Sequence, residues 1–216
     1  MRYLATAIVV FLLCSLTFTA GCIETPPSRQ IQVGDNVAVE FTMYIGDVVM
    51  VTSNETKYDQ ILKSGMMSVP LILTEDPVVT AGDITNNEEL AIPTKTHKNP
   101  YWFLKGEYNA IAGNIVGLER GDTIRIPIYT YETEKTGFLT NEQCKKQGLD
   151  KRLIKAGDRL TYTRTIGDAT SIGKGEYNQN NLINKQSMIH EMLVVAITDE
   201  GLTYQELYDT VEITIV

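Results

Sequence analysis

The sequence predicts an α+β fold in which a twisted antiparallel sheet packs around a short helix, and three observations support this prediction. A Gly-Asp pair stands before alternating apolar residues at three places, residues 34–35, 121–122 and 157–158. Residues 108–118 are typical of a short helix followed by a turn, and residues 211–216 alternate as a final strand. Apolar residues at every second position indicate a strand with one buried face, so strands dominate the predicted fold.

The stretch 30–54 predicts the first hairpin. Its first Gly-Asp turn precedes a strand on which Val37, Val39 and Phe41 share one face. A second Gly-Asp pair, at 46–47, reverses the chain into another strand, because both residues tolerate the backbone angles of a tight turn.

The remaining elements follow in order along the chain. Residues 56–63 predict a short helix, and the turns at 121–122 and 157–158 begin two further strands. Residues 192–198 predict a strand that ends before a glycine break. The terminal strand 211–216 is expected to fill the middle of the sheet, because its apolar residues alternate with Glu212 and Thr214.

Composition bounds the class of protein. A chain of 216 residues with 43% hydrophobic content can bury a sizeable core, as one domain or as one domain with a large insertion. Lysine and arginine number 19 against 27 acidic residues, which gives a net charge of −8. Nucleic acid and anionic lipid headgroups are therefore poor partners for this protein.

The N-terminus predicts export. Residues 1–21 combine a short positive start, an apolar run and small residues before Cys22, which is typical of a signal peptide. The end of this segment, Thr-Ala-Gly-Cys, resembles the lipobox of prokaryotic lipoproteins, although Thr19 stands where that motif has an aliphatic residue. The resemblance implies lipidation of Cys22, with residues 22–30 as a linker; the alternative is an uncleaved helical anchor. Both predict a domain held at the cell membrane on its extracytoplasmic face.

Candidate chemistry is sparse. Cys144 is the single cysteine after Cys22, so an intramolecular disulfide is not expected. His97 and His190 are isolated in the sequence, and we predict neither a metal site nor a cofactor. Asn54 begins an N-glycosylation sequon, for which a chance tripeptide is the alternative.

Three segments together carry a resemblance to a known family: "VGDNVAVEFTMYIGDVVMVTSN", "IAGNIVGLERGDTIRIPI" and "YDTVEITIV". In this order they resemble the FKBP-type peptidyl-prolyl cis-trans isomerases. The extra length before the last segment is similar to the SlyD-like subclass, which has a second small domain inserted in the flap. The resemblance implies an FKBP-like domain over 31–131 and 208–216 and a mostly-β insert over 132–207.

The resemblance also implies a chemistry and a pocket. Rotation about an X-Pro bond faces an amide barrier of about 18–20 kcal/mol, and a water-poor aromatic pocket lowers it without any proton transfer. The family's positions correspond here to the following candidate pocket residues: Phe41, Val51, Thr52, Tyr108, Ile111, Tyr131 and Val211.

Several of these positions depart from the family's pattern. Phe41 replaces a tyrosine, Met43 replaces a glycine, and Val51-Thr52 replaces a Phe-Asp pair. The departures predict a degraded pocket with no secure catalytic residue, and a plain core role is the alternative for each apolar member.

Three hypotheses of function follow. The first is a membrane-tethered FKBP-like isomerase, or rotamase, that acts as a folding factor on unfolded or proline-containing segments of exported proteins. The second is a non-catalytic chaperone or peptide-binding lipoprotein domain that uses apolar surface of the insert. The third is a surface domain that has lost ligand binding.

Overall fold

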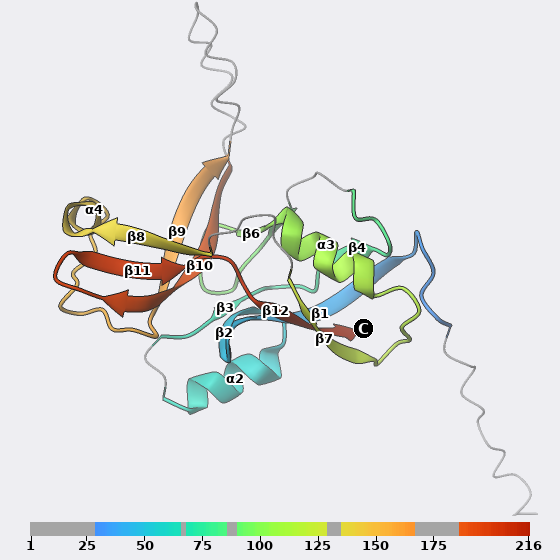
Figure 1. Ribbon diagram of the computed structural model, residues 1–216. Coiled ribbons are helices and arrows are strands. Elements are labelled where there is room, and N and C mark those ends of the chain that lie inside the picture. Colours follow the sequence, from blue (N-terminus) through green and yellow to red (C-terminus); the bar gives the residue numbers. More distant parts are fainter. Residues whose placement is uncertain (1–28, 66–67, 86–89, 129–134, 167–185) are drawn as a thin grey trace, which may run out of the picture.

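The computed structural model describes residues 29–65, 68–85, 90–128, 135–166 and 186–216 (Figure 1). The fold is α+β and consists mostly of strands, which form two mixed sheets accompanied in this part of the chain by three short helices. The predicted fold class is confirmed at this level. Parallel pairing of β2 with β3 and of β6 with β10 makes both sheets mixed rather than purely antiparallel.

The first sheet has the order β3-β2-β1-β12-β7, and β4 also pairs with β1. Its strands are β1 (Asn36–Ile45), β2 (Val48–Thr52), β3 (Leu71–Ile72), β4 (Val78–Thr80), β7 (Thr123–Pro127) and β12 (Thr210–Ile215). The C-terminal strand β12 lies between β1 and β7, so its predicted place inside the sheet is confirmed.

The second sheet has the order β5-β6-β10-β11-β8, and β9 also pairs with β10. Its strands are β5 (Leu90–Ile92), β6 (Tyr101–Phe103), β8 (Thr136–Thr140), β9 (Arg159–Ile166), β10 (Gln186–Ile197) and β11 (Gly201–Gln205). Four of these strands fall within the predicted insert 132–207, whereas β5 and β6 precede it in the chain and join the same sheet.

The three helices are short and differ in burial. Helix α2 (Glu55–Lys63) has no buried residue and is capped by Asn54. Helix α3 (Lys105–Asn114) begins three residues before the predicted helix and buries one face. Helix α4 (Asn141–Lys146) covers the second sheet and buries Cys144, which is 1% exposed.

The Gly-Asp turns at 34–35, 121–122 and 157–158 share one structure. The φ angles are +91° at Gly34, +91° at Gly121 and +93° at Gly157, a region that glycine adopts without the steric cost of a Cβ. In each turn the aspartate accepts a hydrogen bond from the backbone N–H three residues earlier, at 2.8–2.9 Å. The prediction that one turn chemistry begins three strands is therefore confirmed.

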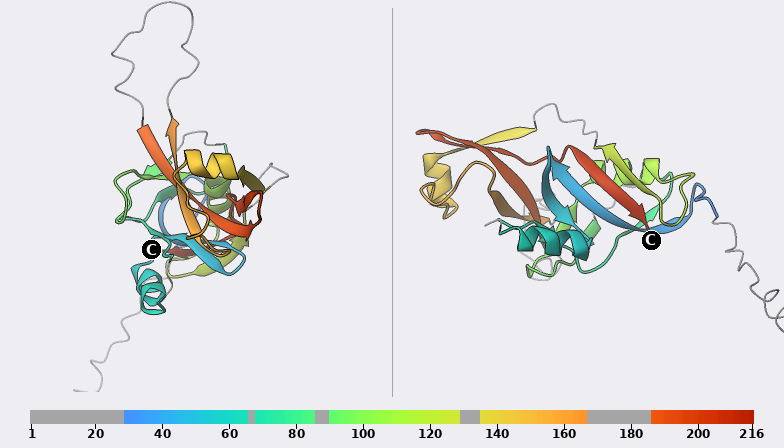
Figure 2. Two further views of the ribbon diagram at one scale, coloured as in Figure 1. Left: turned by 90° about the vertical axis from the view of Figure 1, so that its left-hand side faces the viewer. Right: turned by 90° about the horizontal axis from the view of Figure 1, so that it is seen from below.

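One hydrophobic core joins the two sheets. It contains Phe41 and Met43 of β1, Tyr101 of β6, Ile111 of α3 and Ile189 of β10. A smaller cluster of Leu139, Cys144 and Leu202 lies between the second sheet and α4. Figure 2 shows α4 and its sheet at one end of the molecule and the end of β12 at the other.

Candidate functional site

The candidate pocket residues lie in the core. Phe41, Val51, Thr52, Tyr108, Ile111 and Val211 come from β1, β2, α3 and β12, and each is between 0% and 4% exposed. The five apolar members belong to one cluster, so the structure brings them together. Tyr131 lies outside the described residues. The pocket assignment itself stays a prediction, because burial places these side chains but does not test their role.

An aromatic side chain of the chain itself covers this cluster. The ring centroid of Phe103 is 5.4 Å from that of Phe41 and 6.4 Å from that of Tyr108, in tilted and edge-on contacts. Phe103 is 1% exposed and belongs to β6. The apolar surfaces that would line a ligand pocket are therefore in contact with the protein's own side chains.

The polar members are also engaged. The Thr52 hydroxyl donates to the Phe41 carbonyl at 3.1 Å and accepts from the Asn54 N–H at 3.0 Å. The Tyr108 hydroxyl accepts from the backbone N–H of Thr80 at 3.1 Å. The Thr52 proton is thus already donated within the chain, and the Tyr108 oxygen is held by the backbone.

A buried ionisable cluster lies at the joint between the two sheets. His190 of β10 is 0% exposed, Glu107 of α3 is 2% exposed, and 3.1 Å separates His190 Nε2 from Glu107 Oε1. The Tyr101 hydroxyl donates to Glu107 Oε2 at 2.8 Å, and the backbone N–H of Leu104 donates to the same oxygen at 2.9 Å. The carboxylate thus connects α3 to two strands of the second sheet.

Both nitrogens of His190 face oxygen acceptors. Nδ1 lies 3.1 Å from the backbone carbonyl of Glu191, while Nε2 faces Glu107. A backbone carbonyl only accepts hydrogen bonds, so Nδ1 is the donor in its contact. Through Nε2, His190 forms a buried hydrogen-bonded pair with Glu107.

Aromatic rings enclose the imidazole. The ring of Tyr208 stacks on the imidazole of His190 with centroids 4.6 Å apart. The ring of Tyr101 also stacks on His190, with centroids 5.4 Å apart. Burial, aided by the charge of Glu107, raises the pKa of both tyrosines well above the ordinary value. They therefore stay protonated.

A second polar contact joins the sheets. Arg159 of β9 donates from Nε to the carbonyl of Val49 on β2 at 2.7 Å and from Nη1 to the carbonyl of Ser68. Glu191, 3% exposed, has its pKa raised by burial to about 8, an effect that Arg159 opposes. Its Oε2 atom has no hydrogen-bond partner among the described residues.

Sequence reasoning missed this cluster. His190 is isolated in the sequence but not in space, because its partner Glu107 is 83 positions away. The available signal was a His-Glu pair inside the apolar run of β10, where a charged pair needs partners once it is buried. The cluster is closed to solvent and links α3 to β6 and β10.

Strand β8 forms one edge of the second sheet, where backbone N–H and C=O groups can donate or accept hydrogen bonds. The backbone N–H of Asn141 donates to the Glu200 carbonyl, and that of Glu206 donates to the Lys135 carbonyl. These two bonds show which residues of β8 point their backbone groups toward β11. In such a ladder alternate residues direct N–H and C=O away from their partner strand. On β8 these residues include Thr136 and Phe138, and β8 is the last strand in the order of its sheet.

Phe138 adds apolar surface to this edge. Its side chain is 46% exposed and lies against Gly201, where a Cβ would be 2.6 Å from Phe138 Cζ. Leu139, the next residue, faces the small core on the opposite side. Phe138 therefore presents an aromatic ring on the outer face of the sheet, on the strand whose edge carries the outward backbone groups.

Asn54 is engaged as a helix cap. Its Oδ1 accepts from the Lys57 N–H at 2.7 Å, and its Nδ2 donates to Glu40 Oε1 at 2.6 Å. A glycan on Nδ2 would replace the hydrogen bond to Glu40 as it is formed here. Glycosylation at this sequon stays a prediction.

No protein-family model matches this chain, and no curated protein matches its sequence. Within the ranges that the structure describes, no helix is long and apolar enough to cross a membrane, and no group of three His, Cys, Asp or Glu residues could hold a metal ion. The predicted signal and Cys22 lie outside those ranges.

Proposed function

We propose that this protein is a membrane-tethered, FKBP-like folding factor that binds extended segments of exported proteins without catalysing prolyl isomerisation. The observation that carries the proposal is the closure of the candidate pocket, whose described members are at most 4% exposed. The resemblance of the three sequence segments supports an FKBP-like protein. The edge of the second sheet at β8 is the surface that would bind the peptide.

Closure of the pocket argues against catalysis. An isomerase must bind the twisted imide more tightly than the planar one, and this requires side chains that touch the substrate. Phe103 fills the position over Phe41 and Tyr108, and the hydroxyls of Thr52 and Tyr108 already have partners. A proline ring has no surface to enter while Phe103 remains in place.

The edge of β8 supports peptide binding. An extended chain that adds as a strand gains main-chain hydrogen bonds, and pockets or rings at alternate positions select its side chains. Thr136 and Phe138 offer the backbone groups, and the exposed ring of Phe138 offers apolar contact. This geometry suits unfolded or extended segments of low sequence specificity.

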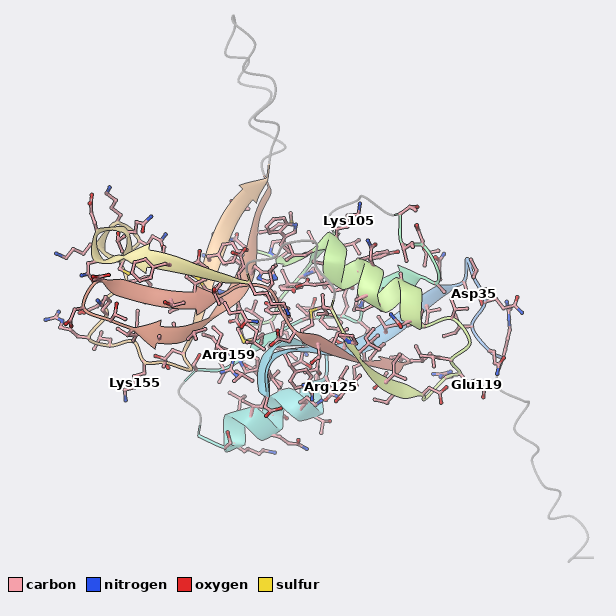
Figure 3. All side chains as sticks on the ribbon, viewed as in Figure 1. Asp35, Lys105, Glu119, Arg125, Lys155 and Arg159 are labelled. Atoms are coloured by element: carbon pink, nitrogen blue, oxygen red, sulfur yellow. The ribbon has the colours of Figure 1, made fainter. Side chains whose placement is uncertain are left out.

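The arrangement also suits a tether at the N-terminus. Asp35, near the start of the described fold, lies at one end of the molecule. Lys155, which precedes β9 of the second sheet, lies at the other end (Figure 3). A chain held through Cys22, or through an uncleaved anchor, would direct the β8 edge away from the membrane and toward exported clients.

A soluble fragment beginning at Ile23 tests the proposal in two assays. We expect it to leave the rate of proline-limited refolding unchanged while suppressing aggregation of an unfolded client. Phe138→Asp should abolish the suppression, whereas Leu153→Asp, a matched control at a loop residue that is 77% exposed, should retain it.

The second candidate function is isomerase activity, favoured by the assembly of five candidate pocket residues in one cluster. A refolding rate that rises with the concentration of the fragment would support it and would contradict the non-catalytic proposal. If neither refolding nor aggregation changes, a surface domain without ligand binding is the better description.

A further inference from the structure

Three loops bring exposed apolar side chains together where the chain enters the fold. They carry Val33, which is 74% exposed, Ile84, which is 57% exposed, and Val116, which is 41% exposed. We propose that these three residues, the terminal apolar patch, dock into the surface of the lipid bilayer that holds the protein. The inference rests on the membrane tether in the proposed function and goes beyond it, because it orients the fold.

Val33 and Ile84 each lie against a glycine of a neighbouring segment. A Cβ at Gly82 would lie 3.0 Å from Val33 Cγ1, and a Cβ at Gly113 would lie 3.3 Å from Ile84 Cγ2. Gly82 also donates its N–H to the Ala112 carbonyl at 2.7 Å, which holds its loop against the C-terminal half of α3. The loop that contains Gly82 and Ile84 therefore lies between Val33 and the end of α3.

Backbone hydrogen bonds fix the loops to one another. Gly34 donates to the Ala81 carbonyl at 2.8 Å, and Gly117 donates to the Ile31 carbonyl at 2.8 Å. Val33 and Val116 are therefore each one residue from a bond that ties two loops together. The patch is a built surface that needs no rearrangement to face a membrane.

The tether places this end of the molecule near lipid. Between Cys22 and Arg29, where the described fold begins, the chain advances 29 − 22 = 7 residues, which span roughly 20 Å when extended. Asp35 and Glu119, close in sequence to Val33 and Val116, lie at the same end in Figure 3, far from Lys155. A fold held this closely meets the bilayer with this end first.

A short tether also lets a weak surface bind. Linking two sites gives the second contact a high effective concentration, so a few apolar side chains are sufficient for docking. Charges around the patch have both signs, with Arg29 paired to Asp35 at 3.2 Å and Arg120 beside Glu119. Docking should therefore depend on apolar insertion and be insensitive to salt and to anionic lipid.

The test uses the full chain, purified with its own anchor and reconstituted into phosphatidylcholine vesicles. Single cysteines at Val33, Ile84 and Val116 are labelled with an environment-sensitive fluorophore, and the unmodified chain measures background labelling; Cys144 is buried. Val33→Cys is compared with Leu153→Cys, the matched control, which is 77% exposed and two residues before Lys155, the residue that Figure 3 labels at the opposite end. Lipids that carry a quencher in the acyl chain report insertion.

We expect blue-shifted emission and loss of most of the signal to the lipid quencher at the three patch positions, and neither effect at 153. The double change Val33→Asp and Ile84→Asp should remove the quenching at 116 while the protein still floats with the vesicles. Both side chains are exposed, so these changes leave the core intact.

Three outcomes overturn the inference. Flotation with no quenching at the patch would show a tethered fold that does not dock, and leaves the proposed function standing. Failure to float would contradict the tether itself. A blue shift in detergent without vesicles, together with a dimer in sedimentation, would assign the patch to a second copy of the chain.

Discussion

His190 Nε2 lies 3.1 Å from Glu107 Oε1 in the interior of the protein, and this contact joins β10 of the second sheet to α3 beside the first. The same carboxylate accepts from the Tyr101 hydroxyl and from the Leu104 backbone N–H. The two sheets are therefore joined by charged and polar groups as well as by the shared apolar core.

Removal of this carboxylate should weaken the whole fold. Glu107→Ala leaves a buried imidazole and a buried tyrosine hydroxyl without their acceptor, and we expect a loss of about 3–5 kcal/mol in the free energy of unfolding. Glu107→Gln keeps an acceptor for Tyr101 and offers a donor to a neutral His190, so its loss should be about 1–2 kcal/mol. Urea titration of both variants measures the difference, and equal losses would show that the fold needs the charge of the carboxylate and not only the hydrogen-bond acceptor that Gln retains.

Phe103 should be coupled energetically to Phe41. Their ring centroids are 5.4 Å apart, and both side chains are 1% exposed. Phe103→Ala should cost about 3–5 kcal/mol, and a double-mutant cycle with Phe41→Ala should give a coupling of about 0.5–1.5 kcal/mol. Phe138→Ala, at a ring that is 46% exposed, is the control and should cost far less. Strictly additive losses would argue that Phe103 does not cover Phe41.

The local features of the fold could be predicted because they depend on neighbours in the sequence. At 34–35, 121–122 and 157–158 the glycine has a positive φ and the aspartate accepts from the N–H three residues earlier, so each of these turns is formed by neighbours in the sequence. The alternation of Val37, Val39 and Phe41 likewise predicted the buried face of β1.

Long-range pairing could not be predicted in the same way. Strands β5 and β6 have three residues each, too few for a clear periodicity, and they are positioned by pairing with each other and with β10, where Tyr101 lies beside Ile189. The same pairing brings Phe103 over the candidate pocket. Five of the candidate pocket residues share one core cluster, and the segment that covers them is distant in the sequence and has a pattern that carried no signal.

Asn54 should contribute as a helix cap whether or not it carries a glycan. Asn54→Ala removes the acceptor of the Lys57 N–H, and we expect α2 to lose about 1 kcal/mol of stabilisation. Thr56→Ala destroys the sequon but keeps the cap, so thermal unfolding should change little. Mass spectrometry of the exported protein separates the two roles: loss of a glycan mass in Thr56→Ala would show that the sequon is used.

Glu191 should make the protein less stable as the pH rises toward 8. Burial raises its pKa in the folded protein from 4.5 to about 8, so between these values the folded state retains a proton that the unfolded state has lost. The stabilisation that comes from the retained Glu191 proton is complete below about pH 4.5 and is lost as the pH rises through 8. The change in the free energy of unfolding is on the order of a few kcal/mol at most.

Asp150 and Asp209 have lowered pKa values, so their contributions to stability change in acid and not between pH 4.5 and 8. Urea midpoints at pH 5, 6.5 and 8 measure the trend, and Glu191→Gln, which cannot ionise, should reduce it. A variant with the same pH dependence as the unmodified protein would show that Glu191 is already ionised in the fold, with Arg159 as its effective partner.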